Sequence, residues 1–183
     1  MVGHMTLNHV IGVRAPARQH MKDTAKALAW IVSILRQRQI PFQIPGGLAA
    51  KAYGSQRDIN DVDIDIPDNR IPDILEVVQP YITYGPTRHR DKKWDCLLLT
   101  LNYEGQEIDI SGAYSIKIHD DIRDAWIDSP TDFSKAIPME LFGLTVPVMP
   151  AEDLAKYKKM LEGEHQKKDI IAIEKWIRNQ RKN

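Results

Sequence analysis

Four aspartates in two short segments of the chain have the residue type and spacing of a metal site. Asp61, Asp63 and Asp65 alternate with apolar residues, and Asp109 stands between two isoleucines. Strict alternation is typical of a β-strand, in which every second side chain lies on the same face. Successive carboxylates on that face are about 6.6 Å apart and, at an effective dielectric of about 20, repel by about 2.5 kcal/mol. A bound cation would offset this repulsion, whereas a solvated face of an edge strand is the alternative.

The second acidic segment supplies the remaining ligand that a metal site needs. If its strand lies beside the first one, Asp109 reaches the face that Asp61 and Asp63 occupy. Three carboxylates from two strands suit a hard divalent cation with oxygen ligands, magnesium first. Glu107 and Ser111 share the face of Asp109 and replace it if the register differs.

A glycine pair upstream of the acids predicts a place where the backbone can approach a phosphate. Gly46 and Gly47 follow Pro45 at an expected strand-to-helix turn. Without side chains there, backbone amides can contact an anion, and a helix N-terminus adds a favourable dipole. The chain between Gly47 and Asp61 is long enough for one helix and a return into a strand. A simple turn is the alternative reading of this pair.

The elements that must position these residues follow from the spacing of apolar residues. We expect an α+β fold: a small mixed β-sheet flanked by helices, with C-terminal helices. We expect one domain over residues 1–183, with 1–19 as a mobile lead-in and 150–183 as the C-terminal helices. The expected helices span residues 20–39, 48–53, 71–78, 150–161 and 169–178, and the expected strands span 42–44, 61–66, 94–103 and 106–111, with further short strands within 114–149.

Composition excludes several classes of protein. Lys and Arg total 25 and Asp and Glu total 25, so the zero net charge argues against a chain-wide nucleic-acid-binding surface. Cys96 is the only cysteine, which excludes an intramolecular disulfide and argues against a cysteine zinc site. We find neither an apolar stretch of about 18 residues nor a secretory signal. We therefore expect a cytoplasmic protein that does not engage a membrane.

Taken together, these motifs resemble the nucleotidyltransferase fold of the DNA polymerase β superfamily. The resemblance rests on Gly46-Gly47, Arg57, the Asp-Val-Asp-Ile run at 61–64 and the Glu-Ile-Asp-Ile run at 107–110. It is strongest to lincosamide and aminoglycoside nucleotidyltransferases and their small bacterial relatives, and it extends over residues 42–176. Many members have a serine where this chain has Gly47.

The resemblance implies a two-metal transfer of a nucleoside monophosphate. Asp61 and Asp63 would bind two magnesium ions, and Asp109 would complete the metal site and act as the general base. A hydroxyl of the acceptor would attack the α-phosphorus of a nucleoside triphosphate such as ATP, and pyrophosphate would leave. All three aspartates are therefore expected to be both catalytic and metal-binding.

The same resemblance implies which residues bind the nucleotide. Gly46 and Gly47 would hold the phosphates, while Arg57 and Lys159 would neutralise their charge. The acceptor could be a small molecule, an RNA end or a protein hydroxyl, and the sequence does not choose among them. Two alternatives keep the fold without catalysis: an antitoxin-like module that binds a partner protein, and an RNA-binding domain that uses the basic residues of 167–182.

Three histidines are weaker candidates. His89 lies in a basic run at 88–93, which we expect to be a solvated loop, with phosphate binding as the alternative. His119 precedes two aspartates, but no second histidine stands at ligand spacing, so a loop is expected there. His165 is expected on the surface between the last two helices, with a contact to the nucleotide as the alternative.

Overall fold

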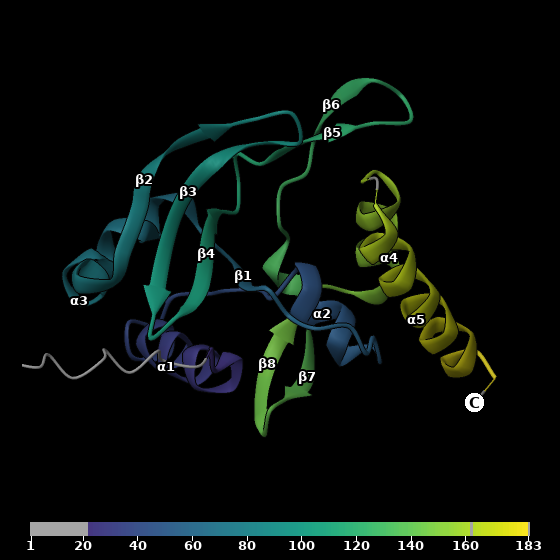
Figure 1. Cartoon of the computed structure of the whole chain (residues 1–183), viewed down its shortest axis with the longest axis horizontal. Coiled ribbons are helices and arrows are strands. Elements are labelled where there is room, and N and C mark those ends of the chain that lie inside the picture. The colour runs from purple at the N-terminus through teal and green to yellow at the C-terminus, as the bar shows by residue number, and fades with distance from the viewer. Residues whose placement is uncertain (1–21, 162, 183) are drawn as a thin grey trace, which may run out of the picture.

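The computed structural model describes residues 22–161 and 163–182, in which helices surround a curled mixed sheet (Figure 1). The expected α+β architecture is confirmed. The expected lead-in, residues 1–19, lies outside the described residues. The helices are α1 (Thr24–Gln37), α2 (Gly46–Ala52), α3 (Leu75–Val78), α4 (Ala151–Lys159) and α5 (Glu164–Gln180), with 3₁₀ segments η1 (Asp68–Ile74), η2 (Gln79–Tyr81) and η3 (Phe133–Lys135). The strands are β1 (Asp61–Ile66), β2 (Ile82–Arg90), β3 (Trp94–Tyr103), β4 (Gln106–Gly112), β5 (Lys117–Asp120), β6 (Ala125–Asp128), β7 (Ile137–Leu141) and β8 (Leu144–Val148).

The main sheet brings the two acidic segments together. Its strand order is β1-β4-β3-β5-β6, and β2 pairs with β3. β1 and β4 are parallel, and Asp63 lies opposite Asp109 in their register. Strands β7 and β8 form a separate two-stranded sheet. The parallel pairing of β1 with β4 is therefore the contact that makes a shared acidic face.

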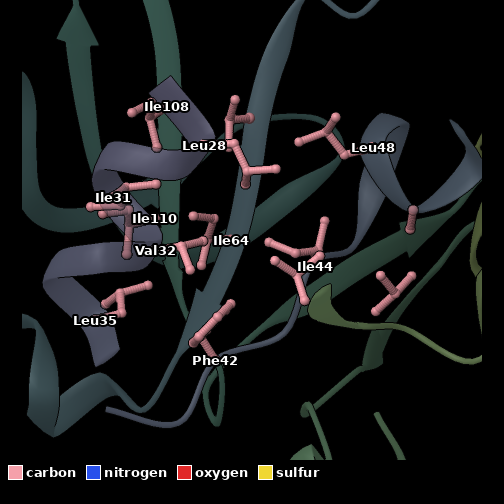
Figure 2. Packing of buried hydrophobic residues seen from close by; sticks show 14 of the residues in the cluster. Leu28, Ile31, Val32, Leu35, Phe42, Ile44, Leu48, Ile64, Ile108 and Ile110 are labelled. Carbon is pink, nitrogen blue, oxygen red and sulfur yellow. The ribbon is translucent and has the colours of Figure 1, made fainter. Parts of the chain in front are cut away.

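The opposite face of β1 and β4 forms the core against α1. Figure 2 shows Ile64, Ile108 and Ile110 packed with Leu28 and Ile31 of α1. All five side chains are at most 1% exposed. Because side chains alternate along a strand, burying the isoleucines turns the aspartates to the other face. The predicted inward direction of the apolar residues of β1 is confirmed.

The C-terminal helices lie on the other side of the sheet from α1 (Figure 1). The last helix begins at Glu164, five residues before the expected start at Asp169, and it places His165 in its first turn. The apolar residues Ile170, Ile173 and Ile177 indicated the later part of this helix. Its first turn is polar and carried no such pattern. Among residues 22–161 and 163–182, no helix has both the length and the apolar character that a bilayer crossing requires.

One whole strand, β2, was not predicted from the sequence. Residues 88–90, expected in a loop, belong to β2, which pairs with β3 and places His89 opposite Cys96. Gly85-Pro86 was the misleading signal, since such a pair usually breaks a strand. β2 pairs with β3 alone among the described strands, and its register shifts between Tyr84 and Thr87. A proline is tolerated at such an irregularity of an edge strand.

Two further elements differ from expectation in type. The helix expected at residues 71–78 is a 3₁₀ segment up to Ile74 and α-helical only from Leu75, and Pro72 lies inside it. His119, expected in a loop, lies in β5, where it pairs with Trp126 of β6. Both differences concern short elements, whose local signals are the weakest.

Candidate active site

A cavity of about 470 Å³ lies on the acidic face of the sheet. Residues at the start of α2, on β1, β3 and β4, and on the C-terminal helices line it. Of the residues predicted for the site, Gly46, Gly47, Arg57, Asp61, Asp63 and Asp109 all line this cavity. The fold therefore gathers six of the seven predicted site residues around one space.

Carboxylates crowd the β1–β4 end of the cavity. The parallel register places Asp61 opposite Glu107 and Asp63 opposite Asp109. Asp61, Glu107 and Asp109 each present an oxygen, and these oxygens lie within 4.8 Å of one another. This group contains Glu107, the residue named as an alternative ligand, in place of the expected Asp63. Four acidic side chains thus converge where the sequence predicted three.

Asp63 lies directly beneath the first glycine of the pair. A Cβ atom on Gly46 would be 1.9 Å from Oδ2 of Asp63, and Gly46 has a φ of +65°. Only glycine fits this close approach and this left-handed backbone. Burial, followed by the nearby charges of Asp61 and Asp109, raises the pKa of Asp63 to about 7.

Burial and neighbouring negative charges also disfavour ionisation of Asp109 and Glu107. Burial and the charge of Asp61 raise the pKa of Asp109, although the Thr100 hydroxyl donates a hydrogen bond to its Oδ1 at 2.7 Å. Burial and the charges of Asp109 and Asp61 raise the pKa of Glu107. Mutual repulsion among oxygen ligands is the electrostatic setting that a divalent cation relieves. The donor set therefore fits magnesium or a similar hard cation.

Two basic side chains of the cavity, Arg57 and Lys158, are held by one buried aspartate. Asp169 is fully buried and accepts from Lys158 Nζ at 2.8 Å, from Arg57 Nε at 2.9 Å and from Ser55 Oγ at 2.6 Å. Burial opposes ionisation, but the hydrogen bonds from Lys158 and Ser55 hold the pKa of Asp169 below its ordinary value. A Cβ on Gly47 would lie 2.5 Å from Nη2 of Arg57. The two cations are thus fixed beside the glycine pair.

The structure does not bring the predicted Lys159 to this cavity. Its ammonium pairs with Glu174 at 2.7 Å on the exposed side of the helix. The preceding residue, Lys158, is 2% exposed and lines the cavity instead. Ala151, Leu154, Ala155 and Lys158 form the buried stripe of α4 at i, i+3, i+4 and i+7. That spacing was the signal in the sequence that selects Lys158 over Lys159.

The histidines are divided between the cavity and the surface. His89 lines the cavity, and its Nε2 lies 3.3 Å from Oδ2 of Asp91. His165 is exposed, as expected, although it also lies at the cavity wall. His119 is outside the cavity, where its Nδ1 lies 3.1 Å from Oδ1 of Asp121. Of the three histidines within residues 22–161 and 163–182, His89 and His165 therefore line the cavity.

The part of the cavity away from the glycine pair is largely apolar. Asp65 stands at its edge, is 5% exposed and accepts a hydrogen bond at 2.7 Å from the Thr131 hydroxyl. Burial raises the pKa of Asp65 to about 7. Asp65 belongs to the acidic run noted in the sequence, but neither it nor the apolar residues of this part were predicted to be site residues. The apolar residues of this part are Trp94, Cys96, Leu98, Ile116, Ile118, Tyr157 and Leu161.

Comparison by sequence and comparison by structure give different results. No family model matches the chain, and no curated protein matches it in sequence. Solved structures do match. A candidate nucleotidyltransferase from Thermotoga maritima has a TM-score of 0.59 at 18% identity, with 89% of this chain and 99% of that one covered.

Two antibiotic-modifying proteins match almost equally well. The lincosamide antibiotic adenylyltransferase LnuA, solved with lincomycin bound, has a TM-score of 0.58 at 15% identity and covers 84% of this chain and 98% of its own. ANT(2″)-Ia, solved with adenylyl-2″-tobramycin, has a TM-score of 0.59 at 14% identity, with coverages of 86% and 91%. At these identities the likeness establishes the fold, and the predicted nucleotidyltransferase fold is confirmed.

Proposed function

We propose that this protein is a metal-dependent nucleotidyltransferase that moves a nucleoside monophosphate from a nucleoside triphosphate to a hydroxyl group. The observation that carries the proposal is the parallel β1–β4 register. It puts Asp61, Asp63 and Asp109 on one cavity wall, facing the glycine pair. The solved structures of the same fold include an adenylyltransferase and a complex with an adenylylated antibiotic, which supports the same reaction class.

Magnesium is the cation that this donor set suits best. Asp61, Asp109 and Glu107 would hold it, and Asp63 completes the carboxylate wall from beneath Gly46. Bound magnesium, as one ion or two, would neutralise charge on the attacking and leaving oxygens of an in-line displacement.

The triphosphate would lie between the glycine pair and the two fixed cations. Gly46 and Gly47 leave room for phosphate oxygens near the backbone. Arg57 and Lys158 supply positive charge, and Asp169 holds both in place. Lys158 takes the role that the sequence reading gave to Lys159.

Asp109 is the proposed general base. It is half-buried, the Thr100 hydroxyl orients it, and its second oxygen can accept a proton from a hydroxyl held beside the metal. The acceptor hydroxyl would lose its proton to Asp109 as its oxygen bonds to the α-phosphorus. The bond from that phosphorus to the pyrophosphate oxygen breaks, so charge and atoms balance.

The proposed function is tested by following the labelled nucleotide, because this does not require the acceptor to be known. The full chain is incubated with magnesium, a cell extract and each of the common nucleoside triphosphates labelled at the α-phosphate. We expect one triphosphate to pass label to an extract component, and we expect Asp109→Asn to slow the transfer by about 10²–10⁴-fold. Asp95→Asn is the matched control, because Asp95 is a buried carboxylate of β3 that pairs with Arg88 outside the cavity.

Absence of label from every triphosphate would contradict the proposal and favour a binding module with the same fold. Equal transfer by wild type and Asp109→Asn would contradict the assigned base. The two results differ, so the reaction class and the role of Asp109 are tested separately.

A further inference from the structure

The cavity continues past the carboxylates into a region of different chemistry. Along β3, the side chains that line it are Trp94, Cys96 and Leu98, and further along the strand Thr100 bonds to Asp109. The wall therefore changes from apolar to acidic in the direction of β3. We call the apolar region the apolar end of the cavity; its residues are Trp94, Cys96, Leu98, Ile116, Ile118, Tyr157 and Leu161.

The apolar end is built from packed side chains. Cys96, Ile116 and Ile118 form a buried cluster of their own, separate from the main core. The ring of Tyr157 from α4 lies 5.7 Å from that of Trp94, centroid to centroid. Strand side chains and helix side chains thus enclose the space from two sides. Such a region binds the apolar body of a ligand and excludes water.

Asp65 stands where the apolar end meets the carboxylates. Its side chain is 5% exposed, and Thr131 donates to Oδ2 at 2.7 Å. Among the described residues, no second hydrogen bond reaches this carboxyl, which leaves Oδ1 as an acceptor on the cavity wall. Because Oδ1 is open to the cavity, a hydroxyl or ammonium group of a ligand can donate to it in place of water.

The distance along β1 sets the size of such a ligand. Asp63 and Asp65 are two residues apart on one strand face, a separation of about 6.6 Å. Asp65 is paired with Ser111 in the β1–β4 register, two residues beyond the pair formed by Asp63 and Asp109. A hydroxyl that reacts beside Asp109 and a second polar group at Asp65 would be separated by about the width of one substituted ring.

Charge decides what kind of molecule fits there. Asp61, Asp63, Asp65 and Asp109 all line the cavity on this side, and Asp91 adds a further carboxylate. With magnesium held by the other acids, Asp65 and Asp91 still carry uncompensated charge, and an RNA phosphate placed against them costs free energy at short range. The basic residues Arg57 and Lys158 lie beside the glycine pair, where the triphosphate needs them.

Resting on the proposed function, we propose that the apolar end together with Asp65 is the acceptor subsite. Its ligand is a compact amphipathic small molecule: an apolar ring or chain with the reacting hydroxyl and a second hydroxyl or ammonium group that donates to Asp65. RNA ends and anionic molecules are excluded from this subsite. The nucleobase lies elsewhere.

Three probes of equal apolar size test the chemistry directly. Binding of 2-phenylethylamine, 2-phenylethanol and 3-phenylpropionate to the full chain is measured by ligand-observed NMR at pH 8.5, where Asp65 is ionised, without nucleotide or metal. We expect the amine and the alcohol to bind and the carboxylate to bind at least about tenfold more weakly. Asp65→Asn is expected to weaken the amine by about tenfold or more, since a hydrogen bond to a charged group is lost.

Blocking variants place the probes at the apolar end. Leu98→Trp fills this space and is expected to abolish binding of the amine and the alcohol. Leu161→Trp blocks it from the helix side and replaces Leu98→Trp if that variant melts early. Asp95→Asn and Val77→Trp are the matched controls, because both lie outside the cavity, and they are expected to bind as wild type does.

Three results would overturn the inference. The first is equal binding of the carboxylate and the amine. The second is binding that persists in both blocking variants. The third is adenosine that competes with the amine in wild type and whose own binding, measured directly, is lost in Leu98→Trp, which would assign the apolar end to the nucleobase.

The outcome is separable from that of the proposed function. If the probes bind in the expected pattern but no label is transferred, the small-molecule site is supported and the transferase function is contradicted. Label transfer to RNA alone would keep the transferase and overturn the acceptor subsite.

Discussion

The two faces of the β1–β4 pair are made of alternate residues of the same strands, yet they are held in opposite ways. On one face, Val62, Ile64, Ile108 and Ile110 are at most 1% exposed beneath α1. On the other face, carboxylates one residue away repel one another and have raised pKa values. Burial of the first face stabilises the fold. The second face carries like charges whose repulsion a bound cation can relieve. Substitutions on the two faces should therefore act on different properties.

The largest expected effect is on the acidic face. Asp109→Asn removes the proposed base while keeping the size of the side chain, and it should lower kcat by about 10²–10⁴-fold. The melting temperature should not fall, because a repelling charge is also removed. Steady-state kinetics with the identified triphosphate, together with a thermal melt, measure both quantities. A fall in melting temperature equal to that of a core variant would contradict the expected difference between the two faces.

The apolar face should show the reverse. Ile64→Ala leaves a cavity beneath α1 and should lower the free energy of unfolding by about 2–5 kcal/mol. Transfer activity per folded molecule should remain close to that of wild type at a temperature where the variant is folded. Urea denaturation gives the stability, and activity is normalised to the folded fraction. A large loss of activity in fully folded Ile64→Ala would show that the two faces are coupled.

A smaller effect of opposite sign is expected for the neighbouring residue. Asp63→Asn should raise the free energy of unfolding in metal-free buffer by about 1–2 kcal/mol, since salt screens part of a repulsion of about 2.5 kcal/mol. The gain should shrink when magnesium is added to both proteins. Urea denaturation with and without chelator compares them. Destabilisation of metal-free Asp63→Asn would mean that the carboxylate is favourably bound in the fold.

The smallest expected change is one in the pH dependence of stability, and it concerns Asp169, which belongs to neither face. Its folded pKa is depressed, so its contribution to stability is present above its unfolded pKa of about 3.9 and is lost as pH falls through the lower folded pKa. Below about pH 4, wild type should therefore lose stability more steeply than Asp169→Asn. Urea denaturation across pH 3–6 measures this difference, and Asp73→Asn, an exposed carboxylate, is the control. Parallel pH profiles for wild type and Asp169→Asn would contradict the buried ion pair as a stabilising contact.

The sequence was informative where local pattern determines structure. Alternation identified β1 and the face of its aspartates, and the strands expected at 94–103 and 106–111 are β3 and β4. It was misleading where two signals conflict, as at Gly85-Pro86 in β2, and where neighbouring residues share a type, as with Lys158 and Lys159.

Other parts of the site could not be predicted because they depend on packing at long sequence separation. The apolar end joins residues of β3, residues 116–118 and α4, and nothing in their local pattern indicates that they meet. Asp169 gathers Ser55, Arg57 and Lys158 from distant segments in the same way. Such contacts are set by the tertiary fold.

The most direct test of the central claim is the melting temperature with magnesium and a triphosphate that carries a methylene bridge between its α- and β-phosphates. Ligand binding to the folded state alone raises stability by RT ln(1 + [L]/Kd), about 2.7 kcal/mol at a hundredfold excess over Kd. Wild type should show a rise that requires both magnesium and the analogue, and Asp61→Asn should lose it. An unchanged melting temperature in wild type, or an equal rise in Asp61→Asn, would contradict the acidic face as a metal–nucleotide site.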